Sequence, residues 1–147
     1  ADQRGRIRPA DLGSVVNAAG GDGSDIGAFE FSDLSIDIDG DGNYDPLTDG
    51  LLIIRYLFGL TGNALTSNAI GTLPARSTPQ EILQYLDSIR PALDVDGNTQ
   101  ADALTDGMML IRYLFGLRGP ALTAGAIGSN PGRTEAAMGP YIQSLMP

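Results

Sequence analysis

An acidic phrase that occurs twice, 57 residues apart, places the strongest constraint on what this chain can fold into. The first copy spans residues 37–49 and the second spans residues 94–106, and each runs directly into an apolar segment that contains Ile-Arg-Tyr-Leu-Phe-Gly-Leu. In the first copy Asp37, Asp39 and Asp41 stand at every second position, and a glycine and later carboxylates follow them. A loop that wraps a hard cation such as Ca²⁺ needs this succession of oxygen ligands around a tight bend. The phrase therefore predicts two calcium sites, one in each copy.

The duplication extends well beyond the acidic phrase. Residues 35–71 and 92–128 are identical at 22 of 37 aligned positions. Weaker similarity continues to the end of the chain, where Pro74 and Arg76 match Pro131 and Arg133 and, after a one-residue deletion, Tyr85 matches Tyr141. A repeat of this strength decides the architecture. We expect two tandem units, residues 35–91 and 92–147, preceded by an arm of residues 1–34.

Each unit is expected to read as loop, helix, connection and helix. In the first helix of the first unit, Leu51, Leu52, Ile54, Leu57 and Phe58 form the predicted apolar stripe. Arg55 then falls on the expected solvated face, and Gly59 is the expected C-terminal cap. Residues 63–71 have the composition of one short helical turn.

The second helix of the first unit has clear start and stop signals. Thr78-Pro79-Gln80-Glu81 is a capping box with proline at the first helical position, which predicts a helix over residues 79–89, and Pro91 ends it. In the second unit Gly139-Pro140 falls inside the matching helix, residues 135–145, so we expect that helix to be kinked or to start late. The arm contains one segment of strand character, residues 25–31. The fold class expected is mainly α, with two calcium-binding repeats that share a core and an extended arm holding a short β-strand.

The ligands follow from counting along each loop. With Asp37 as position 1, the carboxylate that an EF-hand places at position 12 is replaced by Thr48, and Asp49 follows at position 13. The second copy repeats this shift, so we expect the backbone to bulge around residues 46–47, and either the position-9 or the position-13 aspartate could touch the ion. The predicted metal-site residues, with Asn43 and Gln100 at the position that ligates through its backbone carbonyl, are Asp37, Asp39, Asp41, Asn43, Asp45, Asp49, Asp94, Asp96, Asn98, Gln100, Asp102 and Asp106.

The two loops are not equally well suited to a cation. Asn98 replaces an aspartate in the second copy, and Thr99 stands where the first copy has the bend glycine, Gly42. A side chain at a bend with positive φ costs strain. We therefore expect the loop at residues 37–49 to bind calcium more tightly. The alternative interpretation is that both phrases are ordinary Asp/Gly/Asn turns.

Composition narrows the function classes. Fifteen of the 18 acidic residues are aspartates, and nine of these lie in the two phrases, so the net charge of −9 is largely ligand charge. The chain has no lysine, histidine or cysteine. This excludes zinc sites of the usual kind and histidine-based acid–base catalysis, and an acidic chain offers no electrostatic surface for nucleic acid. No stretch of 18 apolar residues exists to insert into a membrane.

The loops and the helices that follow them resemble the dockerin family. The resemblance rests on Asp37, Asp39, Asp41, Gly42, Asp45 and Asp49 in the first unit, and on Asp94, Asp96, Asn98, Asp102 and Asp106 in the second. It implies calcium-stabilised loops in a secreted protein and a cohesin-type partner. Two departures stand out: the unit is longer than a usual dockerin half, and the last carboxylate comes one residue late. Separately, residues 2–5 and 25–30 resemble the closing segment of secreted parallel β-helix proteins.

Three functions remain in competition. The leading expectation is a non-catalytic, calcium-stabilised extracellular or cell-surface module that binds another protein, since such loops fill at extracellular calcium concentrations. The second is a subunit of a calcium-dependent filament or layer, in which copies of the chain bind one another. The third is an enzyme, which we do not expect because the clustered carboxylates are taken as ligands. The chain starts at Ala1, without a methionine or signal peptide, and we expect it to be a processed piece of something longer.

Overall fold

The residues that follow each acidic loop form a helix, as the repeat predicts. The computed structural model describes residues 34–147, and within this range it holds six α-helices and no strand. The predicted strand at residues 25–31 and the rest of the arm lie outside the described residues. The mainly α class with two repeats around a common core is confirmed. The helices are α1 (Leu51–Leu57), α2 (Asn63–Thr66), α3 (Pro79–Ile89), α4 (Met108–Leu114), α5 (Pro120–Thr123) and α6 (Glu135–Ser144).

The start and end signals act as expected in the first unit. Helix α3 begins after Thr78, whose side chain accepts a hydrogen bond from the backbone of Glu81 while the Glu81 carboxylate accepts one from the backbone of Thr78. Helix α1 ends at a glycine with φ of 85°, and the amides of Gly59 and Leu60 donate to the carbonyls of Tyr56 and Arg55. This pair of bonds is a Schellman motif, for which glycine is suited because it carries no β-carbon. A 3₁₀ turn, Arg90–Leu93, then leads into the second unit.

Two details of the helices differ from expectation. In α1 the fully buried positions are Leu52 and Ile53, together with the nearly buried Tyr56, whereas Phe58 is 56% exposed. Of the predicted stripe, Leu52 is fully buried and Leu51, Ile54 and Leu57 are half-buried, so Phe58 is the member that was wrong. Ile53 and Tyr56 were not anticipated. Of the two alternatives for α6, a kink or a late start, the late start is wrong, because the helix begins at Glu135 and Pro140 lies inside it. Proline has no amide hydrogen, so the carbonyl of Ala136 loses its usual intrahelical donor.

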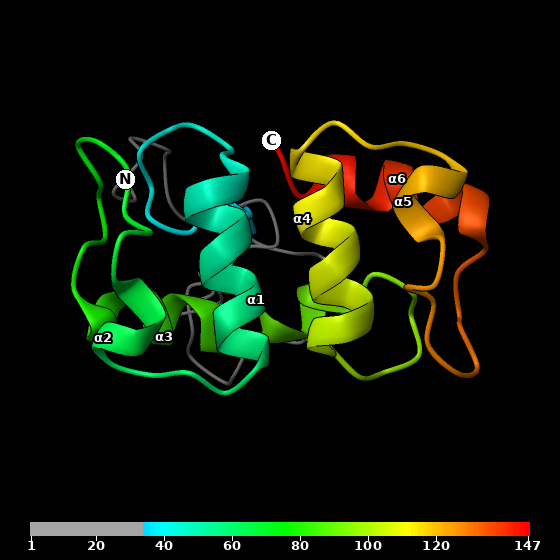
Figure 1. Ribbon diagram of the computed structural model, residues 1–147, viewed down its shortest axis with the longest axis horizontal. Helices are drawn as coiled ribbons and strands as arrows, with labels where there is room; N and C mark the ends of the chain where they lie inside the picture. The colour runs from blue at the N-terminus through cyan, green and yellow to red at the C-terminus, as the bar shows by residue number, and fades with distance from the viewer. Residues whose placement is uncertain (1–33) are drawn as a thin grey trace, which may run out of the picture. The chain divides into compact units, whose positions relative to one another are not determined.

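Helices α1 and α4 lie side by side and run in opposite directions (Figure 1). Their contact is reciprocal. A β-carbon on Gly50 would lie 3.0 Å from Cγ1 of Ile111, and one on Gly107, the equivalent position, would lie 3.2 Å from Cδ1 of Leu57. The start of each helix therefore packs closely on the later turns of the other, and the missing β-carbons allow this approach.

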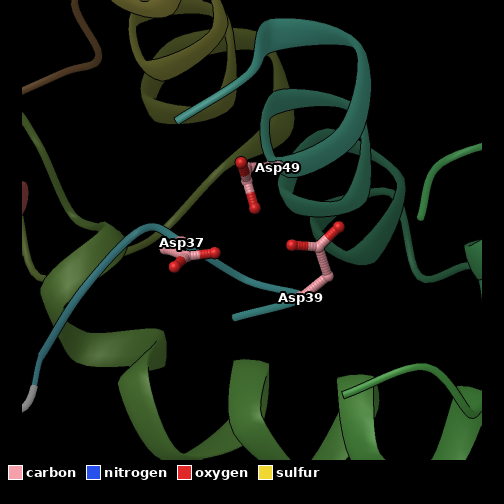
Figure 2. Close-up of side chains that lie close together, drawn as sticks. All are labelled: Asp37, Asp39 and Asp49. Carbon is pink, nitrogen blue, oxygen red and sulfur yellow. The ribbon is translucent and has the colours of Figure 1, made fainter. Parts of the chain in front are cut away.

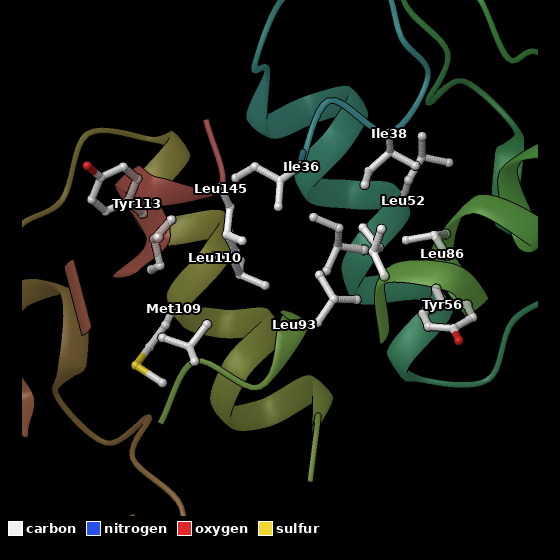
Figure 3. Close-up of a cluster of buried hydrophobic side chains, with 14 of the residues drawn as sticks. Ile36, Ile38, Leu52, Tyr56, Leu86, Leu93, Met109, Leu110, Tyr113 and Leu145 are labelled. Carbon is white, nitrogen blue, oxygen red and sulfur yellow. The ribbon is translucent and has the colours of Figure 1, made fainter. Parts of the chain in front are cut away.

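The core is continuous across both repeats, and Leu34–Pro147 form one compact unit (Figure 3). The amide of Ile36, just before the first loop, donates to the carbonyl of Leu145 near the end of the second unit at 3.0 Å. None of the helices in residues 34–147 has the length and apolar character needed to span a bilayer. The most deeply buried core side chains include Ile36, Ile38, Leu52, Ile53, Leu65, Ile82, Leu86, Ile89, Leu93, Met109, Leu110 and Leu122.

Candidate metal centres

Each acidic loop brings three carboxylates to one point. Oxygen atoms of Asp37, Asp39 and Asp49 all lie within 4.8 Å of one another, and the three side chains point toward a common centre (Figure 2). The second loop repeats the arrangement with Asp94, Asp96 and Asp106. Calcium binds oxygen at 2.3–2.6 Å, so oxygens on opposite sides of one ion are about 5 Å apart. The separation in each triad therefore fits a single ion.

A wide turn at the start of the helix brings the last aspartate into the triad. The amide of Gly50 donates to the carbonyl of Asp45, five residues back, at 3.2 Å, and Gly107 donates to Asp102 at 3.0 Å. These bonds define π-helical turns, Pro46–Gly50 and Ala103–Gly107, which continue into α1 and α4. A π turn holds one more residue than an α turn, and such turns are common at functional sites. The extra residue in the loop is thus absorbed in a backbone bulge, as expected.

The two loop aspartates at position 9 lie elsewhere. The side chain of Asp45 is exposed and accepts a hydrogen bond from the amide of Leu47 at 2.7 Å, so it caps the wide turn. Asp102 is also exposed, and its side chain makes no capping bond. The geometry therefore places position 13, and not position 9, with the first two aspartates of each loop.

The remaining predicted ligands surround the triads without belonging to them. The carboxylate of Asp41 accepts from the amide of the exposed Asn43 at 2.8 Å, and the side-chain oxygen of Asn98 accepts from the amide of Gln100 at 2.8 Å. In both loops these bonds close the bend, because each side chain accepts from the backbone amide two residues later. The involvement of Asp41, Asn43, Asp45, Asn98, Gln100 and Asp102 with the ion stays a prediction.

Two of the three carboxylates in each triad are buried, and backbone amides hold them in place. Asp39 and Asp49 are fully buried, as are Asp96 and Asp106 in the second loop. Oδ1 of Asp49 accepts from the amide of Ile38 at 2.6 Å, and Oδ2 accepts from the amide of Asp45 at 2.9 Å. These bonds tie the start of the helix to the start of the loop and to its middle. The second loop has the same pair of bonds, from Val95 and Asp102 to Asp106.

Burial makes these carboxylates expensive to ionise. The pKa of Asp49 is raised to about 7, chiefly by burial and also by the neighbouring charges of Asp39 and Asp37, against the lowering effect of the backbone bonds. Burial also raises the pKa of Asp39 and of Asp106. Clustered, buried carboxylates of this kind are stabilised in their ionised form by a bound cation. The donor set, oxygen only and anionic, is the one that calcium or another hard cation prefers.

Two glycines of the connecting segments belong to the sites and were not anticipated. The amide of Gly71 donates to Oδ2 of Asp39 at 2.5 Å, and a β-carbon at Gly71 would collide with the carboxylates of Asp41 and Asp39. Gly128 does the same in the second unit, with its amide 2.7 Å from Oδ2 of Asp96. The identity of Ala-Ile-Gly in both units was the signal that could have found them.

Comparison with known protein families, with characterised proteins and with solved structures finds no match to this chain. The functional argument therefore rests on the two aspartate triads and on their repeated loop–helix setting.

Proposed function

We propose that the chain is a non-catalytic, calcium-stabilised module of an extracellular or cell-surface protein, similar in its loops to dockerins, that binds another protein. The observation that carries this proposal is the convergence of three carboxylates in each repeat, two of them fully buried. Each ion would be held by Asp37, Asp39 and Asp49 or by Asp94, Asp96 and Asp106. When bound, the ion supplies positive charge that neutralises the cluster, and the loop is then fixed to the helix that follows it.

The position of the last ligand explains how an ion would act on the fold. Asp49 lies in the turn that opens α1, and the next residue, Gly50, packs on Ile111 of α4. Asp106 and Gly107 stand in the same relation to α1. Ordering either loop would therefore steady the contact between the two helices, so that the free energy of ion binding becomes free energy of folding.

An extracellular location is part of the proposal. Oxygen-ligand loops that bind calcium weakly are filled at millimolar concentrations outside cells and stay largely empty in the cytosol. The second loop, with Asn98 and Thr99 in place of an aspartate and a glycine, is of this weaker kind.

Exposed apolar side chains support an interaction role. Four of the large exposed apolar residues are two equivalent pairs from the two repeats: Leu47 and Leu104, each 63% exposed, and Phe58 and Phe115, 56% and 55% exposed. These side chains flank α1 and α4 at their two ends. Exposed aromatic and leucine side chains next to ordered helices are suited to contact another protein. The same observation favours the second candidate, a filament or layer built from copies of this chain.

Calorimetric titration of the chelator-treated chain with calcium tests the metal sites. We expect two ions per chain, with magnesium bound much more weakly because it tolerates a crowded carboxylate site poorly. A variant with Asp37→Ala and Asp94→Ala is the control and should bind neither ion tightly. Absence of calcium binding at millimolar concentration, or equal affinity for both metals, would contradict the proposal.

Sedimentation velocity in calcium and in excess chelator separates the two candidate functions. A compact monomer that expands on chelation favours a module with a different protein as its partner. Large species that form only with calcium favour self-assembly. Because the exposed pairs are equivalent in the two repeats, Phe58→Ser and Phe115→Ser should weaken either kind of contact without altering calcium binding.

A further inference from the structure

One arginine in each repeat donates several hydrogen bonds to the backbone of the metal loop. The backbone amide of Arg76 donates to the carbonyl of Asp39 at 2.8 Å. Its side chain donates through Nε to the carbonyl of Ile38 at 2.7 Å and through Nη2 to that of Asp37 at 2.8 Å. A single residue thus satisfies three consecutive carbonyls in the segment that carries the first two aspartates of the triad.

The second repeat contains the same set of hydrogen bonds from an arginine to the loop backbone. The amide of Arg133 donates to the carbonyl of Asp96 at 2.8 Å, and its Nη1 donates to the carbonyls of Asp94 and Val95 at 2.6 Å and 3.1 Å. The arrangement occurs twice in equivalent positions, so it is a property of the repeating unit.

A tyrosine from the last helix of each unit, α3 or α6, supports the arginine. The guanidinium of Arg76 lies 3.8 Å from the centre of the Tyr85 ring, and the Tyr85 hydroxyl donates to the carbonyl of Ser35 at 2.7 Å. In the second unit Arg133 lies 3.6 Å from the Tyr141 ring, and that hydroxyl donates to the carbonyl of Ala92 at 2.7 Å. A guanidinium stacked on a ring keeps its planar fork in one orientation.

The hydrogen bonds from these arginines go to backbone carbonyls, so they leave the carboxylates free for an ion. The alternation of Asp37 and Asp39 puts their side chains on the metal side only when the backbone between them keeps its shape. Fixing that backbone before the ion arrives removes part of the ordering cost of binding. It also limits how closely the carboxylate oxygens can approach one another. A site whose oxygens cannot move closer together favours calcium over the smaller magnesium ion.

We propose that Arg76 and Arg133 are positioning residues that set the affinity of the two sites and their preference for calcium over magnesium. The inference rests on the proposed function, that the triads bind calcium. It assigns this role to the connections between the helices of each unit, residues 67–78 and 124–134, which lie outside the acidic phrases.

The test compares Arg76→Ala and Arg133→Ala with the full-length parent chain in calorimetric titrations with calcium and with magnesium. Arg55→Ala is the matched control, because Nη1 of Arg55 also donates to two backbone carbonyls, those of Leu65 and Ser67, at 3.0 Å and 2.8 Å, but outside the loop. Loss of a partner that holds a metal ligand in place usually costs 10- to 100-fold in affinity. We expect Arg76→Ala and Arg133→Ala each to weaken one of the two calcium-binding steps by about tenfold or more. Magnesium affinity should change less, and Arg55→Ala should leave both steps unchanged.

Each outcome decides a separate point. If the parent chain binds no calcium, the proposed function fails. If the parent binds two ions, and Arg76→Ala and Arg133→Ala bind both metals as the parent does, only the positioning role is overturned. The same follows if Arg55→Ala weakens calcium binding as much as these two variants do. Should Arg76→Ala fail to fold even with calcium, Arg76→Lys replaces it, since lysine keeps the charge without the planar fork. A folded lysine variant with the parent's affinity and selectivity would overturn the role.

Discussion

The amide nitrogen of Ile38 lies 2.6 Å from Oδ1 of Asp49, eleven residues later in the chain. This bond joins the segment that carries the first two aspartates to the turn that opens α1. Asp49 is therefore both a structural acceptor and a member of the carboxylate triad, and the two roles are separable by substitution.

Asp49→Asn should separate them. The amide side chain retains an oxygen for the Ile38 amide and loses the charge that burial disfavours, but its nitrogen cannot accept the bond that the Asp45 amide donates to Oδ2. This variant should therefore destabilise the calcium-free fold less than Asp49→Ala does. Its calcium affinity at the first site should fall sharply. Asp49→Ala removes the acceptor as well and should destabilise the calcium-free fold by about 2 kcal/mol, the usual cost of leaving a buried donor unpaired. Thermal melts in chelator together with calorimetry would check this, and equal destabilisation by both variants would contradict it.

The bend residue should control the difference between the two loops. Thr99 has φ of 76° and Gly42, its equivalent, has φ of 87°, while both amides donate to the first aspartate of their loop at 2.9 Å. A side chain in this left-handed region costs about 1–2 kcal/mol. Thr99→Gly should therefore tighten calcium binding at the second loop and raise the melting temperature in calcium.

The reciprocal change is the matched control. No atom lies within 4 Å of where a β-carbon on Gly42 would be, so Gly42→Thr introduces backbone strain without a collision. It should weaken the first site by a similar amount. If Thr99→Gly weakens the second site, the strain at Thr99 is not what distinguishes the loops.

Much of the architecture was predictable because each repeat contains local sequence signals for where its helices begin and end. The capping box at Thr78 gave helix α3 its bounds, and the shift of the last carboxylate to Asp49 implied the bulge that the wide turn provides. These features are local, since they depend on residues within one turn of each other. The spacing of the acidic phrases put the members of each triad within a larger set of predicted ligands, but it did not decide between Asp45 and Asp49.

Features that depend on packing between distant segments were not predictable in this way. Sequence periodicity favoured Phe58 over Tyr56, but Tyr56 is the buried one, and its hydroxyl donates to Asp87 of α3 at 2.6 Å. Arg55, expected on a solvated face, instead holds the carbonyl of Leu65. Gly71 and Arg76 reach the loop from more than 30 residues away. Only their recurrence in the second unit marked them, and recurrence does not say what a residue contacts.

Gly71→Ala tests the closeness of the connection to the first loop. The added methyl group would meet the carboxylates of Asp41 and Asp39, which must then move away from the metal centre. We expect a loss of calcium affinity at the first site of about tenfold or more, as for other groups that hold metal ligands in place. Gly139→Ala is the control, because its β-carbon would make only an ordinary 3.8 Å contact with Leu122. That variant should bind calcium normally and melt slightly higher, since alanine favours a helix over glycine. Normal calcium binding by Gly71→Ala would contradict the geometry.

The stability of the fold should depend on pH without calcium and largely lose that dependence with calcium bound. Burial raises the pKa of Asp49 to about 7, and it also raises the pKa of Asp39 and of Asp106. In the unfolded chain these groups ionise near pH 4. Between about pH 4 and pH 7 the calcium-free fold therefore holds protons that the unfolded chain has released, and its stability falls as pH rises through this window.

With calcium present this slope should disappear, because the ion binds the ionised carboxylates, and the ion-bound fold, like the unfolded chain, holds none of these protons above about pH 5. Thermal melts from pH 5 to pH 8 should thus show a falling melting temperature in chelator and a nearly constant one in saturating calcium. Asp49→Asn should flatten the chelator curve, since the group that titrates near pH 7 is gone. Parallel curves with and without calcium would mean that the buried aspartates are not the groups that link protons, metal and folding in this chain.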